Sequence, residues 1–235
     1  MSKYESLIEP EELLDINKSP DYVWSGKDVV IGISKGISSV GIVMMNADTT
    51  EKQLVQSWML HPRAKLLEST LESDRYNYLH CEMRGEILTT QEAWVTDEFV
   101  AEVIKAIASS YNVNLQAVGY DSWYCGHIAE ILSEFPFNVQ TVRISQRSNE
   151  IFNEAMLLRK KIKHNNIEFR KINHLLSHSL MDTKIDIENK SVKSSNAVNS
   201  VLAHALINAS ALTERMQDRF DFDDEYLKDM LMKLR

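Results

Sequence analysis

Asp121 is the residue of this 235-residue chain whose type and position best fit catalysis. It ends an apolar run over 117–120, and a helical pattern begins a few residues later. Because the carboxyl ends of strands in α/β sheets face the crevice where ligands bind, the Asp121 carboxylate is a candidate catalytic group or metal ligand. A second interpretation stays open, in which Asp121 caps the turn or the helix that follows it.

A carboxylate at a strand end could take part in metal-assisted cleavage of a phosphodiester, but it would need partners. Two Mg²⁺ ions about 4 Å apart are usually held by several carboxylates from separate elements. The partners of Asp121 would have to project from the first strand and from the long helix near the C-terminus. Ser34 and Asn199 stand there instead, and each brings only a neutral oxygen. We therefore expect a depleted metal site.

The elements that position these residues follow from the apolar pattern. Apolar runs at 29–33, 40–45 and 54–60, joined by short turns, predict an antiparallel meander. Helices and short strands alternate after it, which predicts an α/β fold with a mixed sheet flanked by helices. The expected helices are 97–107, behind Thr96 as N-cap, 126–135, 148–163 and 197–216, and the expected strands are 85–90, 117–120 and 139–144, with a hairpin over 184–193.

Three parts of the chain are predicted. Residues 1–27 form an N-terminal arm with one short helix beginning at Pro10, and residues 28–217 form the folded domain. Residues 218–235 form a C-terminal amphipathic helix that either ends the domain or docks a partner. The apolar positions that share one face of that helix are Leu227, Met230, Leu231 and Leu234.

Composition narrows the class of protein. With 44% hydrophobic residues the chain can bury enough surface to fold, so disorder is excluded. It contains no run of about 18 uncharged apolar residues that would span a membrane, and its acidic start lacks the pattern of a secretory signal. Cys81 and Cys125 are interpreted as reduced thiols of a cytoplasmic protein.

Charge is segregated along the chain. The net charge of −8 would repel nucleic acid, but basic residues gather between 147 and 174. They favour a surface that follows a DNA backbone, although the solvated face of an ordinary helix explains them equally well. Trp123 and Tyr124, beside Asp121, either stack on a base or belong to the core.

Taken in order, these motifs resemble a known family, the nuclease domain of the large terminase subunit of tailed phages, which has a ribonuclease H-like fold. The resemblance covers about 29–212. Tyr120-Asp121-Ser122-Trp123 is similar to the family's strand end, and Gln146 precedes a similar basic helix. The other matching segments are 30–35, 85–90, 95–97, Asp182, Asn189, Lys193 and 198–203.

The resemblance implies a site, cofactors and partners. Family carboxylates that hold the catalytic metals stand at the positions of Ser34, Asp121 and Asn199, so only Asp121 remains as a metal ligand. The cofactor would be Mg²⁺ or Mn²⁺, if there is one. Because no Walker motif is present, we expect a separate ATPase subunit, along with other packaging proteins and double-stranded DNA, in the cytoplasm of a bacterial host. The expected DNA contacts are Arg147, Arg159, Lys160, Lys161, Lys163 and Lys193.

Three functions remain open. The first is a terminase nuclease relative that binds DNA or a packaging partner and cleaves weakly or not at all. The second is an active endonuclease in which Asp48, Asp182 or Asp186 substitutes for the missing ligands of Asp121. The third is a protein-interaction module, without DNA contact, that binds through its acidic arm and C-terminal helix.

Overall fold

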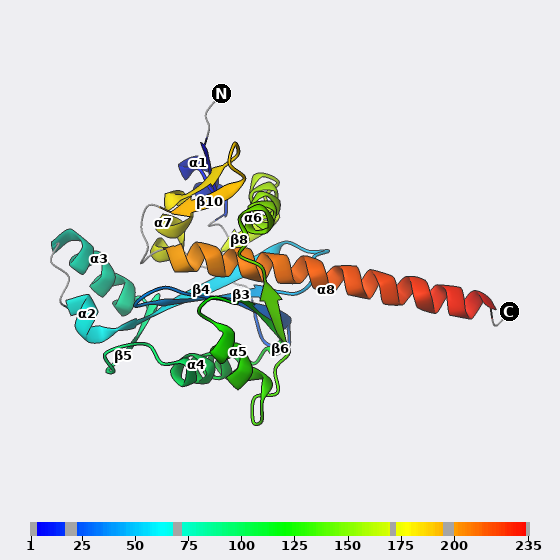
Figure 1. Ribbon diagram of the computed structural model, residues 1–235, viewed down its shortest axis with the longest axis horizontal. Helices are drawn as coiled ribbons and strands as arrows, with labels where there is room; N and C mark the ends of the chain where they lie inside the picture. The colour runs from blue at the N-terminus through cyan, green and yellow to red at the C-terminus, as the bar shows by residue number, and fades with distance from the viewer. Residues whose placement is uncertain (1–3, 17–22, 68–71, 170–172, 195–199, 234–235) are drawn as a thin grey trace.

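The computed structural model describes residues 4–16, 23–67, 72–169, 173–194 and 200–233 (Figure 1). Within these ranges, no helix is both long and apolar enough to cross a membrane. The elements in chain order are β1 (Tyr4–Ser6), α1 (Pro10–Ile16), β2 (Asp28–Lys35), β3 (Val40–Asn46), β4 (Gln53–Pro62), α2 (Arg63–Leu67), α3 (Glu72–Met83), β5 (Ile87–Thr90), α4 (Asp97–Ser110), β6 (Asn114–Asp121), α5 (Gly126–Ser133), β7 (Thr141–Ile144), α6 (Ser148–Lys163), β8 (Ile167–Phe169), α7 (His174–Asp182), β9 (Thr183–Asp186), β10 (Ser191–Ser194) and α8 (Ser200–Lys233).

The main sheet has seven strands and mixes both pairing directions. Its order is β5-β4-β3-β2-β6-β7, with β8 added to β4. The meander β2-β3-β4 is antiparallel, whereas β6 pairs in parallel with both β2 and β7. Helices cover both faces of the sheet (Figure 1). The predicted α/β fold with a mixed sheet is therefore confirmed.

Side chains of β2 alternate between two cores, as the pleat of a strand requires. Val30 packs on the side of α6, α7 and α8, whereas Ile31 and Ile33 pack on the side of α4 and α5. The strands of the meander are thus buried on both faces.

Thr96 caps α4 as predicted, because its Oγ1 accepts a hydrogen bond from the Phe99 N–H at 3.2 Å.

Glycines let α8 lie directly on the sheet. A Cβ added at Gly32 would meet the Ala205 carbonyl oxygen at 2.0 Å, and one at Gly41 would meet the Val201 carbonyl oxygen at 2.4 Å. Since Gly32 and Gly41 lie on the neighbouring strands β2 and β3, they form a shallow track for the helix backbone. This contact fixes the position of α8 over the centre of the sheet.

The N-terminal segment differs from the separate arm that was expected. β1 pairs with β9 in a second, three-stranded sheet of order β1-β9-β10. Leu7, Ile8 and Leu13 are buried in the core shared with α6, α7 and α8. The described residues 4–13 are therefore part of the folded domain.

The last helix also differs from its expected bounds. One continuous helix, α8, runs from Ser200 to Lys233, with no break between the domain and the predicted C-terminal helix. Figure 1 shows its last turns extending beyond the body of the domain. The segment 174–182, for which the sequence predicted no element, is α7, and the Asn173 side chain caps it.

Candidate functional site

Ser34 and Asp121 meet at one edge of the main sheet. The parallel register of β2 and β6 pairs Ile33 with Tyr120, so Ser34 and Asp121 follow at the carboxyl ends of both strands. Both residues are buried, with 6% and 5% of their surface exposed, and both line a cavity of about 390 Å³. The other polar residues that line it are Lys35, Gln146, Ser148, Ser191, Ser200 and His204.

Asp121 is already engaged in local hydrogen bonds. Its Oδ1 accepts from the Tyr124 N–H at 3.2 Å, and the Cys125 thiol donates to Oδ2 at 3.7 Å. The interpretation of Asp121 as a cap of the following turn is therefore confirmed. Burial raises the pKa of the Cys125 thiol, and the negative charge of Asp121 raises it further, so this thiol stays protonated.

A buried amide ties the edge of the sheet to α6 and α8. Asn208 on α8 donates through Nδ2 to the Ile33 carbonyl at 2.8 Å, directly before Ser34. Gln146, just before α6, donates through Nε2 to Asn208 Oδ1 at 3.2 Å. Because Asn208 is fully buried, these bonds hold three segments of the cavity wall in place.

His204 is a site residue that the sequence did not reveal. It lines the cavity from α8, and burial lowers its pKa although the charge of Asp121 acts to raise it. Lys35, the second such residue, lines the cavity and forms an ion pair with Asp97. The sequence offered a signal for Lys35, because this residue directly follows Ser34. It offered none for His204, because the position of His204 depends on how α8 lies across the sheet.

The described residues do not fit a site for two divalent cations. Asp121 is the one acidic residue among those described as lining the cavity. Across the part of the chain that the structure describes, no three His, Cys, Asp or Glu side chains are grouped so that they could hold a metal ion. Ser34 supplies a neutral hydroxyl, and Asn199 lies outside the described residues. A hard dication requires more negative oxygen ligands than this set offers.

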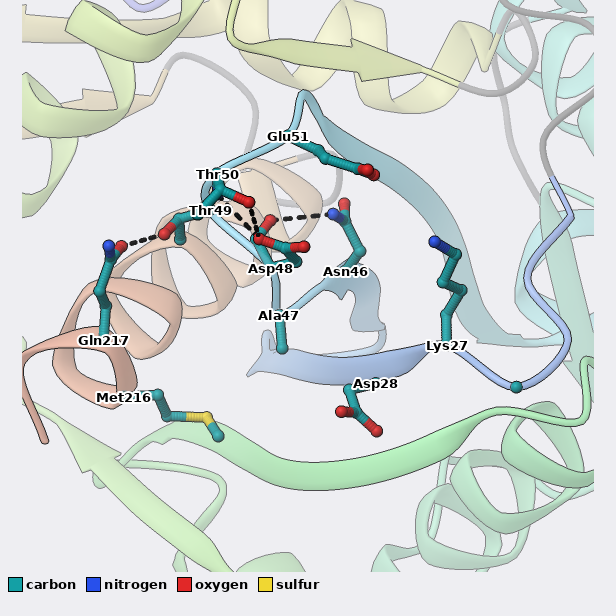
Figure 2. A pocket seen from close by; sticks show the side chains of 11 residues that line it. Lys27, Asp28, Asn46, Ala47, Asp48, Thr49, Thr50, Glu51, Met216 and Gln217 are labelled. Atoms are coloured by element: carbon teal, nitrogen blue, oxygen red, sulfur yellow. Dashed lines mark hydrogen bonds between the residues drawn. The ribbon is translucent and has the colours of Figure 1, made fainter. Parts of the chain in front are cut away.

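Asp48 cannot substitute as a ligand, and this prediction was wrong. The antiparallel register pairs Val29 with Asn46, so the loop that holds Asp48 lies where β2 begins. Six residues of strand, about 20 Å, separate that edge from Ser34. Figure 2 shows Asp48 in a different pocket, where its Oδ1 accepts two hydrogen bonds from Thr50 at 2.6 and 2.8 Å. These bonds lower the pKa of Asp48.

Asp186 and Asp182 are not among the residues that line the cavity. The Asp186 side chain is buried in the β9-β10 hairpin, where its Oδ2 accepts from Asn189 Nδ2 and Lys193 Nζ, each at 2.8 Å. The hydrogen bond from Asn189 and the ammonium of Lys193 hold the pKa of Asp186 well below its usual range. Its role is therefore to hold the hairpin.

The basic residues of α6 were expected to share one exposed face, but they do not. Arg159 follows Leu158 and lies one turn after Ala155, so it falls on the buried side of the helix. Its guanidinium binds Glu12 and lies 3.6 Å from Glu5. The prediction of Arg159 as a solvent-facing residue was wrong because the N-terminal segment covers it.

Lys161 is also turned inward. Its side chain is 14% exposed, and its ammonium lies 2.6 Å from Glu214 and 2.8 Å from the Gln53 side-chain oxygen. Burial lowers the pKa of Lys161 although Glu214 acts to raise it. Lys161 therefore joins α6 to α8 and β4 and offers no accessible charge.

The four other predicted DNA contacts remain accessible. Arg147 is 86% exposed and stands beside the cavity, between Gln146 and Ser148. Lys193 is 55% exposed but bound to Asp186. The two remaining residues, Lys160 and Lys163, lie at the far end of α6 and line a separate groove.

Trp123 and Tyr124 do not belong to the core. They are 79% and 62% exposed, and both line the cavity that contains Asp121. The interpretation that places them in the core was therefore wrong. Two exposed aromatic rings beside a polar cavity provide flat surfaces on which bases can stack.

Comparison with known proteins agrees with this geometry. Residues 2–215 match the family described as terminase large subunit, endonuclease domain. No curated protein matches the chain. The fold is similar to that of the HK97 bacteriophage large terminase, with a TM-score of 0.72 and 14% identity over 88% of this chain and 43% of that one. This chain thus spans less than half the length of that protein.

Two further structures are similar in fold, and both are of the large terminase nuclease from thermophilic phage G20c. The one with bound magnesium gives a TM-score of 0.56 at 12% identity, over 88% of this chain and 96% of that one. The one with bound cobalt gives 0.57 at 12% identity, over the same shares of the two chains. Because the family match covers most of the sequence, the chain belongs to the terminase large-subunit endonuclease domain family.

Proposed function

We propose that this terminase nuclease-family chain binds double-stranded DNA during phage DNA packaging and cleaves it weakly or not at all. The observation that carries the proposal is the content of the cavity at the ends of β2 and β6. Asp121 is the one acid among the described residues there, and Ser34 stands on the neighbouring strand. Losing anionic ligands lowers the affinity for a divalent cation and with it the stabilisation of a charged transition state.

The chain's own residues support binding at this edge. Arg147 supplies an accessible guanidinium for a phosphate, and Trp123 and Tyr124 supply exposed rings beside the same cavity. Lys193 adds a partly exposed ammonium on the β9-β10 hairpin, whose Ser191 and Val192 line the cavity. This set is modest beside the net charge of −8, so the affinity for DNA is expected to depend strongly on salt.

An active endonuclease is less well supported. Of the three substitute ligands considered, Asp48 lies at the opposite edge of the sheet, and Asp186 is held by Asn189 and Lys193. Asp182 is not among the residues described as lining the cavity. The described acids therefore offer Asp121 no second carboxylate.

A nicking assay on supercoiled plasmid tests the proposal. At about 10 mM Mg²⁺ or Mn²⁺, the wild type is expected to leave the plasmid intact. Asp121→Ala is the matched control, since cleavage that requires the cation and disappears in this variant would establish an active enzyme and overturn the claim of weak or absent cleavage.

Fluorescence anisotropy with a labelled duplex tests the claim of DNA binding. Binding that weakens as salt increases is expected for the wild type. Absence of binding at about 50 mM salt, where phosphate contacts are strong, would overturn the DNA-binding role and favour a protein-interaction module.

A further inference from the structure

The outer face of α6 forms a groove of about 670 Å³ that is separate from the Asp121 cavity. Its floor is apolar, with Phe152, Met156 and Leu157, and Leu157 is 45% exposed. Cationic side chains gather at its end, where Lys160 and Lys163 line it. Lys163 binds Glu5, whereas Lys160 is exposed and forms no ion pair with a described residue. The groove therefore combines apolar surface with free positive charge.

The last part of α8 has the opposite character. Residues 218–225 contain five acids and a single arginine, interspersed with Phe220 and Phe222. The backbone of α8 continues without a break through this stretch to Lys233, and it leads away from the body of the domain (Figure 1). The segment could reach the groove of its own chain only if the helix broke after Gln217.

We propose that the 218–233 segment of α8 from a second copy of this chain docks in the α6 groove. The segment is long enough, because the groove follows α6 from Phe152 to Lys163, about 18 Å of helix, and 218–233 spans about 24 Å. If each copy gives its segment to the other, the two exchanges close a symmetric dimer.

Charge sets the direction of the two helices. The accessible cations of the groove, Lys160 and Lys163, both lie at the end of α6. The extension carries most of its acids at its start, in 218–225, and Lys228, Asp229 and Lys233 follow. The acidic start of the extension meets Lys160 and Lys163 only when the two helices run antiparallel, an arrangement that also favours the opposed helix dipoles.

Sedimentation equilibrium across protein concentrations tests the proposal. The wild type is expected to dimerise, and a chain ending at Gln217 is expected to remain monomeric with unchanged helical folding of the body by circular dichroism. Lys160→Glu is expected to weaken dimerisation by about tenfold or more, because it places like charges together. Lys65→Glu, an exposed lysine on α2, is the matched control and is expected to have no effect.

Charge-reversal variants distinguish a specific effect at this interface from a general effect on folding. Asp223→Lys with Asp224→Lys is expected to weaken dimerisation, and combining this pair with Lys160→Glu is expected to restore it. A wild type that is monomeric at about 100 μM, where even weak dimers form, would overturn the proposal. So would a truncated chain that still dimerises, or a combined variant that is no stronger as a dimer than its parents.

Discussion

Ser34 and Asp121 lie on neighbouring parallel strands, each one residue past Ile33 and Tyr120, which are partners in the register. Alternation along the strands turns both side chains to the face that α8 covers, on the same side as Gly32 and Gly119. Positions 34 and 121 thus have the geometry that would bring two carboxylates together, but only Asp121 is a carboxylate. This relationship makes the metal site open to a direct test.

Restoring carboxylates is expected to restore cation binding. Ser34→Asp with Asn199→Asp should increase the affinity for Mg²⁺ or Mn²⁺ by about tenfold or more, because hard dications bind anionic oxygens. Without the cation, repulsion between residue 34 and Asp121 should lower the melting temperature, and added cation should recover it. Isothermal titration measures the affinity, with Asp48→Asn as a control at the opposite edge. An unchanged affinity would contradict the assignment of the site.

Close packing of α8 predicts a large effect at a single glycine. Gly32→Ala would place a Cβ 2.0 Å from the Ala205 carbonyl oxygen and 2.5 Å from the Ala209 nitrogen, so the helix must move. The free energy of unfolding should fall by about 3 kcal/mol, as measured by urea denaturation. Gly126→Ala is the control, because nothing lies within 4 Å of its added Cβ. Its effect should stay within about 0.5 kcal/mol, and equal losses in both variants would contradict the argument.

Much of the fold could be predicted because its elements carry local signals. The meander β2-β3-β4 has uninterrupted apolar runs, and α4 has the Thr96 cap. β1 has three residues, and its partner β9 lies far along the sequence, so nothing local indicated the pairing. The burial of Arg159 followed from the same long-range docking, since Glu5 and Glu12 belong to that segment.

The site was predictable only along the strands that build it. The shared site of Ser34 and Asp121 was expected from the family resemblance, and the parallel register of β2 and β6 produces it, whereas the place of His204 required the tertiary position of α8. The error at Asp48 was avoidable, because an antiparallel meander places the end of β3 beside the start of β2. The register of predicted strands thus decides which acids can meet.

His204 is expected to make stability depend on pH near neutrality. Burial lowers its pKa in the folded protein, whereas the unfolded chain binds a proton near the ordinary value of 6.5. Its contribution to stability is therefore complete above about pH 6.5 and is lost as the pH falls from there through the lowered pKa. Melting temperatures measured between about pH 7.5 and about pH 5 should show this loss, and His204→Gln should reduce it. An equal slope in both proteins would contradict this account.

Removing the Arg159 side chain should lower the free energy of unfolding, because Glu12 then loses its buried partner. Arg159→Ala leaves Glu12 without its guanidinium and is expected to cost about 2–3 kcal/mol, because a partly buried carboxylate is then unpaired. Lys163→Ala removes a half-exposed partner of Glu5 and should cost less than about 1 kcal/mol. Limited proteolysis near residues 4–16 should be faster in the first variant. Similar losses in both would show that burial does not distinguish these ion pairs.

Arg147 should act on DNA affinity, because its guanidinium is exposed beside the Asp121 cavity. Arg147→Ala removes one phosphate contact, so the slope of log affinity against log salt should fall by about one in anisotropy titrations. Lys161→Met is the matched control: it also removes a positive charge, but one that Glu214 and Gln53 already hold inside the domain. Its salt slope should equal that of the wild type. If Lys161→Met changed the slope and Arg147→Ala did not, the DNA would have to approach the Lys161 end of α6, away from the cavity.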